Sequence, residues 1–353
     1  MFYSGVDLHK DNCFITTVND VGEVVKQDRV LNDVLAITTY FRSLPGPHKA
    51  VVESTAGWYW LRDLLIELNV EFVLAHAKYL KAISYAKVKT DKVDSITLAQ
   101  LLRMNLIPEA HTISPKLRPI RDLLRTRLRL VQKRTACYNS IHRLGEKFNC
   151  DHFPNLNEGK LPAQLPDLYK LQVGYFLEQV SLLKEQIKQI EQSLGRQLLD
   201  NDDIQRLLWI PAFGRITAFS IYLEIDGIER FPSEKQLFSY ARLVPGAKNS
   251  NASRRQKSGN KDGNVYLKIA FSDAAVHAIR YYPEIRAFYL RTRRRSNEAI
   301  ARAIVAKELA RIVYHVLKDR APYRGFKGIP IQRQKSMNWP RRRVANTNVA
   351  QQG

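Results

Sequence analysis

Four carboxylates occupy positions in this sequence that suit metal-dependent chemistry. Asp7 and Glu53 each close a short apolar stretch that is predicted to be a strand. Asp91 and Asp94 lie at the start of a predicted helix, where a spacing of three residues puts both side chains on one side of a turn. Each acid alone has an ordinary explanation as a turn residue, an edge charge or an N-cap. The combination points to a cation, because like charges brought together repel unless a cation lies between them.

A carboxylate set of this kind binds a hard divalent cation, and Mg²⁺ is the expected cofactor. Paired metal ions stabilise both the attacking and the leaving oxygen of a phosphodiester displacement. Acids at strand ends followed by paired acids on a helix are typical of an RNase H-like nuclease core. The sequence therefore predicts one composite site, with oxygens of all four carboxylates close enough to bridge metal ions.

The elements that must position these acids form a predicted α/β domain over residues 1–112. A three-stranded meander is followed by alternating strands and helices. The expected strands are 2–7, 12–18, 23–30, 49–53 and 70–74. The expected helices are 34–44, 58–68 and 94–104. This order favours a mixed sheet covered by helices.

The composition indicates a polyanion as partner. The 353 residues include 56 Lys+Arg against 34 Asp+Glu, a formal charge of +22. An apolar content of 45% is ample for packed cores and excludes wholesale disorder. Three scattered cysteines fit neither a disulfide framework nor a zinc site. With no long apolar run to span a membrane, we expect a soluble, cytoplasmic protein that acts on nucleic acid.

Residues 113–200 are predicted to be entirely helical. The basic stretch 116–134 is interpreted as a nucleic-acid-binding face that includes Arg121, Arg125 and Arg129, although a solvated helix face would look the same. Six apolar residues then recur at steps of four and three: Phe176, Val180, Leu183, Ile187, Ile190 and Leu194. This seam either packs a helical hairpin on itself or joins protomers in a coiled coil, and spacing does not separate the two. We expect a homo-oligomer, a dimer or tetramer, held by this seam.

Residues 201–322 are predicted to be mainly helical. The stretch 207–218 resembles a helix-hairpin-helix turn, in which a glycine lets backbone N–H groups approach a phosphate. Gly214 is present in this turn, whereas Ala212 replaces the second glycine that is usual there.

Two further basic features follow in the sequence. Arg293 and Arg294 belong to a run of closely spaced arginines without an internal acid, and such a run favours phosphate as its partner. Residues 323–353 form a basic tail, interpreted as a flexible arm that binds polyanions.

The acidic blocks carry a resemblance to a known family. The blocks 5–10 (GVDLHK), 52–57 (VESTAG) and 89–95 (KTDKVDS) look like those of the DEDD transposases of bacterial insertion sequences, which are related to the pilin-gene invertases. The blocks 239–245 (SYARLVP) and 263–268 (GNVYLK) resemble that family's C-terminal transposase domain. The resemblance extends over most of the chain.

The resemblance implies a RuvC-like N-terminal domain, a helical coiled-coil linker and a mainly α C-terminal transposase domain. It implies that Asp7, Glu53, Asp91 and Asp94 are catalytic residues that bind Mg²⁺. It also implies that a serine of the C-terminal domain attacks DNA and forms a covalent phosphoserine. The partners that it implies are double-stranded DNA, at the element ends and the target, and a structured non-coding RNA that guides the recombination.

The resemblance assigns the nucleophile by position. Counting back from Gly263 without gaps places Ser250 on the family serine, and Ser253 takes the role if the loop aligns differently. A hydroxyl is a weak nucleophile that needs activation. The basic side chains expected to assist it electrostatically are Arg254, Arg255 and Lys257.

Two other functions compete with an RNA-guided transposase. A RuvC-like junction nuclease would use the four acids without a covalent step, and a nucleic-acid-binding protein with a decayed site would cut nothing. Only the transposase forms a protein–DNA adduct that survives denaturation.

Overall fold

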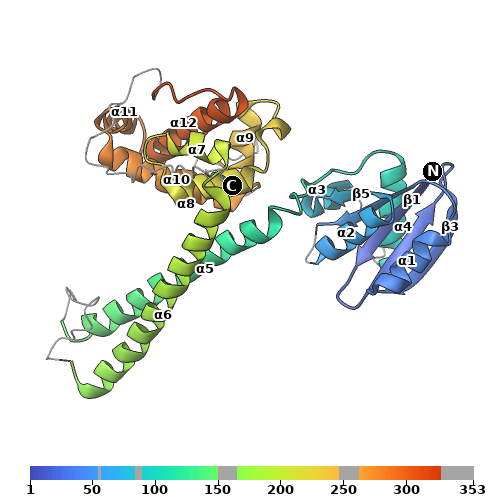
Figure 1. Ribbon diagram of the computed structural model, residues 1–353, viewed down its shortest axis with the longest axis horizontal. Coiled ribbons are helices and arrows are strands. Elements are labelled where there is room, and N and C mark those ends of the chain that lie inside the picture. The colour runs from blue at the N-terminus through green and yellow to red at the C-terminus, as the bar shows by residue number, and fades with distance from the viewer. Residues whose placement is uncertain (55–56, 84–89, 150–164, 246–261, 327–353) are drawn as a thin grey trace, which may run out of the picture. The chain divides into compact units, whose positions relative to one another are not determined.

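The structure, a computed structural model, describes residues 1–54, 57–83, 90–149, 165–245 and 262–326. It consists of two compact units, Met1–Ile113 and Ser114–Gly353 (Figure 1). In the part of the chain that is described, no helix combines the length and the apolar character needed to cross a membrane.

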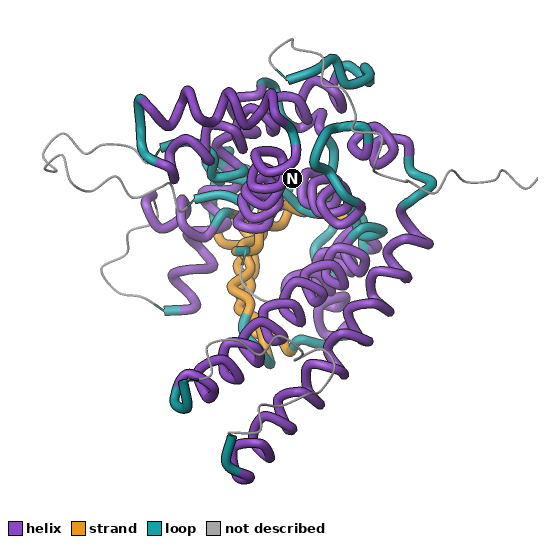
Figure 2. The backbone as a smooth tube through the Cα atoms, turned by 90° about the vertical axis from the view of Figure 1, so that its left-hand side faces the viewer, coloured by secondary structure: helices purple, strands orange, loops and turns teal. Residues whose placement is uncertain are grey.

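The N-terminal unit is built on a five-stranded mixed sheet, as the sequence predicted. Its strands are β1 (Phe2–Leu8), β2 (Asn12–Val18), β3 (Val24–Leu31), β4 (His48–Glu53) and β5 (Val70–Ala75). They lie in the order β3-β2-β1-β4-β5 and are drawn in orange in Figure 2. The meander β1–β2–β3 is antiparallel, whereas β1 pairs with β4 and β4 with β5 in parallel.

Helices cover both faces of this sheet. They are α1 (Val34–Arg42), α2 (Trp58–Glu67), α3 (Ala77–Ile83), which the sequence analysis did not predict, and α4 (Asp91–Arg103). Helices α1 and α2 pack on one face of the sheet and share one apolar cluster. Helix α4 packs on the other face over a second apolar cluster. Gly5 allows the close approach of α4, because a Cβ at this position would lie 2.1 Å from the backbone oxygen of Ser95.

The C-terminal unit begins with a helical hairpin of α5 (Arg118–Glu146) and α6 (Asp167–Leu198). The heptad seam of α6 is buried within this chain: Val180 and Leu183 pack with Cys137 of α5, and Leu194 joins the larger core. The structure therefore favours the hairpin over the coiled coil between protomers, and self-association through the seam would require the hairpin to open.

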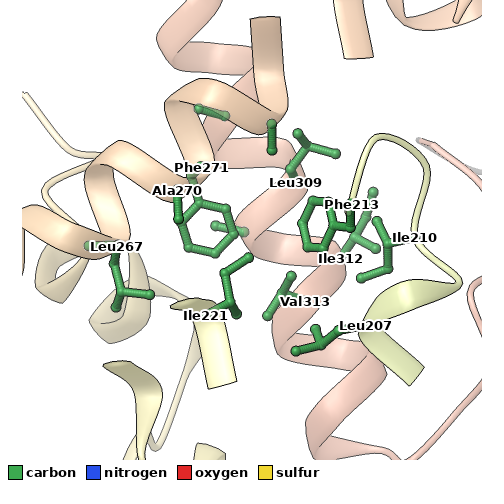
Figure 3. Close-up of a cluster of buried hydrophobic side chains, with 14 of the residues drawn as sticks. Leu207, Ile210, Phe213, Ile221, Leu267, Ala270, Phe271, Leu309, Ile312 and Val313 are labelled. Carbon is green, nitrogen blue, oxygen red and sulfur yellow. The ribbon is translucent and has the colours of Figure 1, made fainter. Parts of the chain in front are cut away.

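The remaining helices form one core with the base of the hairpin. They are α7 (Asp202–Leu208), α8 (Arg215–Ile225), the 3₁₀ turn η2 (Ile228–Arg230), α9 (Glu234–Tyr240), α10 (Val265–Tyr281), α11 (Pro283–Arg294) and α12 (Glu298–Lys318). Figure 3 shows the centre of this core, where Phe271 of α10 and Leu309 of α12 lie near Ile221 of α8. Because Leu124 of α5 and Leu198 of α6 belong to the same core, the hairpin is not separated from the helices that follow it.

Candidate metal and nucleic-acid sites

Asp7 and Glu53 lie at the carboxyl ends of neighbouring parallel strands. In the ladder between β1 and β4, Val6 pairs with Val52. The next residue on each strand is the acid, so Asp7 and Glu53 occupy equivalent positions beside each other. Parallel pairing thus brings together two residues that are far apart in the sequence.

Both acids lie on the face of the sheet that α4 covers. Side chains alternate along a strand, so Asp7 shares the face of Gly5, and Glu53 shares the face of Val51. Gly5 lies directly against the α4 backbone, and Val51 packs in the apolar cluster under that helix. The strand ends and the start of α4 therefore meet on one side of the sheet.

The start of α4 presents the other two acids. The backbone N–H of Val93 donates to the hydroxyl of Thr90, which ends the loop and begins the helix. Asp91 and Asp94 lie in the first turn, where the helix dipole favours negative charge. The helix begins at Asp91, three residues before the start expected from the sequence.

His9, to which no role was assigned from the sequence, lies between Asp7 and Asp91. The Nε2 atom of His9 is 3.2 Å from Oδ2 of Asp7 and 3.3 Å from Oδ1 of Asp91. Among the described residues, one ligand atom from each of these three side chains forms a group within 4.8 Å. Glu53 and Asp94 do not belong to this group. The local signal for His9 is its position two residues after Asp7, at the same edge of the sheet, but that position does not reveal its contact with Asp91.

The negative charge of Asp94 interacts with Asp7, a member of this group. Burial raises the pKa of Asp7, His9 opposes that shift, and the negative charges of Asp91 and Asp94 add to it. Acids that repel one another in a partly buried place are stabilised by a cation. Carboxylate oxygens with one imidazole are also a donor set that divalent cations accept. The residues present therefore fit a divalent metal ion.

Arg121 and Arg125, predicted to contact nucleic acid, are bound inside the protein. Both donate two hydrogen bonds to the carboxylate of Glu224, which is 1% exposed, at 2.7–3.0 Å. Asn264 donates a further bond of 2.7 Å to Glu224. Arg121 is itself buried, and the guanidinium groups of both arginines are already paired with Glu224.

Arg129, Arg293 and Arg294, which were also predicted to bind nucleic acid, are exposed. Arg293 also lines a groove between α10, α11 and α12. This groove is lined by four arginines, one acid and four apolar or aromatic residues: Arg280, Arg286, Arg293, Arg302, Glu298, Val276, Ile279, Tyr289 and Leu290. Its excess of positive charge suits a phosphate backbone.

The turn between α7 and α8 holds Gly214 at the N-cap of α8, exposed and with open space where a Cβ would point. Its φ of −86° is open to any residue. The left-handed residue of the turn is instead Ala212, with a φ of 67°. Ala212, at the position usually held by glycine, thus adopts the left-handed backbone conformation that favours glycine, and this costs some strain.

The predicted nucleophile and its basic neighbours lie outside the described residues: Ser250, Ser253, Arg254, Arg255 and Lys257. Two contacts hold the described residues on either side of them together. The backbone N–H of Asn264 donates to the oxygen of Tyr240 at 2.6 Å, and Nε of Arg242 donates to the oxygen of Gly263 at 2.7 Å. Gly263 has a φ of +102°, and a Cβ there would lie 2.4 Å from the same Tyr240 oxygen.

Comparisons with known proteins agree on the class that these features define. A family model of DEDD transposases of the IS110 type, described as "Transposase", matches residues 4–146 and so includes the acidic edge of the sheet. A second model, "Transposase IS116/IS110/IS902 family", matches residues 204–290 of the helical unit. The chain is a transposase, an enzyme that cleaves and rejoins DNA.

Similar curated proteins extend this similarity to nearly the whole chain. A transposase for insertion sequence element IS1111A from Coxiella burnetii is 24% identical over 91% of this chain and 90% of its own length. A transposase for insertion sequence element IS1328 from Yersinia enterocolitica is 23% identical over 88% and 95%. A probable family 20 transposase from Pseudomonas aeruginosa is 23% identical over 82% and 89%. The chain is thus similar to IS110/IS116-family insertion-sequence transposases over most of its length.

Proposed function

We propose that this transposase cuts and exchanges DNA strands at a divalent metal site formed by Asp7, Glu53, Asp91 and Asp94, with Mg²⁺ as the resident ion. The observation that carries the proposal is the convergence of Asp7, His9 and Asp91 within 4.8 Å at the acidic edge of the sheet. The negative charge of Asp94 helps to raise the pKa of Asp7, and Glu53 ends the strand adjacent to that of Asp7.

In this proposal the carboxylates hold the ion and fix where the DNA phosphate binds. A bound divalent ion supplies positive charge that stabilises the oxygens of a phosphodiester displacement. Four carboxylates without it would repel the phosphate. Partial burial of Asp7 keeps bulk water from screening these charges.

We further propose that Ser250 is the nucleophile. Its hydroxyl oxygen forms a bond to the DNA phosphorus, the bond from phosphorus to one DNA oxygen breaks, and the serine proton passes to solvent or the leaving oxygen. The phosphodiester energy is conserved, so a DNA hydroxyl can reverse the step and join a new strand. Water in place of serine would give hydrolysis and no strand exchange.

The proposed nucleic-acid partners are double-stranded DNA and a structured guide RNA. The formal charge of +22 and the exposed arginines Arg129, Arg293 and Arg294 support phosphate binding. If an RNA reads the target by base pairing, the protein needs no base-reading side chains of its own. We also propose that the active form is a homo-oligomer.

Trapping of a covalent intermediate tests this function. The protein is incubated with Mg²⁺, its RNA and nicked element-end DNA, then denatured and analysed for a protein–DNA adduct. The adduct is expected with the parent protein and with Ser253→Ala, and is expected to be lost with Ser250→Ala or Asp91→Asn. An adduct that survives Ser250→Ala but not Ser253→Ala would move the role to Ser253. An adduct that survives loss of both serines would exclude Ser250 and Ser253 as the nucleophile.

A further inference from the structure

The position of His9 suggests a role beyond that of the four acids. Its ring is about half exposed, so it isn't a core residue, and its Nε2 atom faces Asp7 and Asp91 at once. The backbone of His9 is also fixed. Its N–H donates to the oxygen of Asn12 at 3.0 Å, and its own oxygen accepts from Nδ2 of Asn32 at 2.8 Å. The side chain therefore starts from a defined point beside the acids.

The distances match those between ligands of a single ion. Ligand atoms about 2.1 Å from an octahedral ion lie about 3.0 Å apart at neighbouring positions and about 4.2 Å apart at opposite ones. Nε2 of His9 lies 3.2 and 3.3 Å from the two carboxylate oxygens. The three atoms thus need only small movements to surround one cation.

We infer that His9 is a direct nitrogen ligand of the divalent ion held by Asp7 and Asp91. This inference rests on the metal site proposed above and adds a residue and a preference to it. Mg²⁺ takes oxygen ligands almost exclusively, whereas imidazole is a better ligand for transition metals. A site with one imidazole discriminates less against Mn²⁺ and Co²⁺ than an all-carboxylate site does. The competing explanation is that His9 only pairs with the two acids as an imidazolium cation.

Pulsed electron paramagnetic resonance of bound Mn²⁺ separates these explanations without measuring activity. The probe is Mn²⁺ added below one equivalent to the full-length protein. A histidine ligand produces a nitrogen modulation of the electron spin echo, and labelling the histidines with ¹⁵N changes that modulation. Because the labelled parent protein needs no substitution, this measurement stands even if a variant fails to fold.

The variant His9→Asn is expected to lose the nitrogen modulation. Titration calorimetry should show its Mn²⁺ affinity reduced about tenfold or more, because even outer-shell partners of a metal cost 10- to 100-fold. Mg²⁺ affinity should fall less, so the preference for Mn²⁺ over Mg²⁺ should shrink.

His315→Asn is the matched control. His315 also bridges two acids, but it does so through different ring nitrogens, with Nε2 3.3 Å from Glu234 and Nδ1 3.3 Å from Asp319. These three side chains do not form a group around one ion among the described residues. The substitution should leave both the modulation and the affinities unchanged.

Failure of the inference and failure of the metal site give different results. Mn²⁺ binding that is lost in Asp91→Asn but shows no nitrogen modulation in the parent protein would overturn the role of His9 and keep the site. Modulation that persists in His9→Asn would also overturn that role. Absence of Mn²⁺ binding to the parent protein would overturn the site and the inference together.

Discussion

Replacement of Glu224 by Gln tests how the helical unit tolerates its buried charges. The carboxylate of Glu224 accepts hydrogen bonds from Arg121 and Arg125 of α5. It also accepts one from Asn264, the N-cap of α10. Glutamine keeps the size of the side chain but removes its charge, which leaves two guanidinium groups without their counter-ion. Breaking a buried ion pair costs about 3–5 kcal/mol. Because Arg125 is part exposed and can turn to solvent, we expect about 3 kcal/mol.

Urea unfolding monitored by hydrogen exchange in α8 and α10 measures this loss within the unit itself. Glu191→Gln is the control, since Glu191 accepts from Arg127 at 2.7 Å but is 38% exposed. Exposed pairs contribute at most about 1 kcal/mol. Equal losses of stability in the two variants would refute the argument that burial makes the Glu224 pair costly to break.

The pH dependence of the stability difference between the parent protein and Glu224→Gln provides an independent check. Burial alone would raise the pKa of Glu224, but the hydrogen bond from Arg125 and the charges of Arg121 and Arg125 hold it below its usual value. The stabilisation is therefore complete above the unfolded pKa of about 4.3 and is lost as the pH falls through the folded value. The gap between the parent protein and Glu224→Gln should be constant near neutrality and shrink in acid. A gap that widens in acid would contradict the assigned charge state.

Three further changes test the fold and the groove. Gly5→Ala should lower the melting temperature of the N-terminal unit, at a cost of about 3 kcal/mol, because α4 backbone atoms occupy the Cβ position. Leu183→Ala should cost about 2–5 kcal/mol in urea unfolding, independent of protein concentration, whereas its 60%-exposed neighbour Leu182→Ala should cost under about 0.5. Arg293→Gln should weaken DNA binding and reduce the slope of log K against log salt by about 1, whereas Arg311→Gln, already paired with Glu308, should not.

Local sequence patterns were enough to place the acids on their elements. The strands that end in Asp7 and Glu53 were predicted to within a residue at each end, because a short apolar run that closes on an acid is a strong local signal. Their neighbourhood depends on the parallel pairing of β1 with β4, which no local pattern specifies. His9 was overlooked for a similar reason, because its significance comes from Asp91 on a distant helix.

The basic stripe of α5 shows why charge in a sequence does not identify its partner. Arg121 and Arg125 lie on a helix with almost no acids of its own, so nucleic acid was the natural partner to expect. Their counter-ion, Glu224, is 103 and 99 residues away in the chain. Only tertiary packing reveals that two of the stripe's charges serve the interior, whereas Arg129 stays exposed.

The heptad of α6 marks the limit of spacing as a predictor. Leu182 and Leu183 are adjacent leucines, yet one is 60% exposed and the other 8%, because only the second lies on the stripe that faces α5. The period predicts which side of a helix is buried, since that follows from the geometry of one helix. It does not predict what covers that side, because a second segment of the same chain and a second protomer bury the same leucines equally well. Stability that does not depend on concentration is the property that distinguishes them, and it makes Leu183 the residue that decides between hairpin and coiled coil.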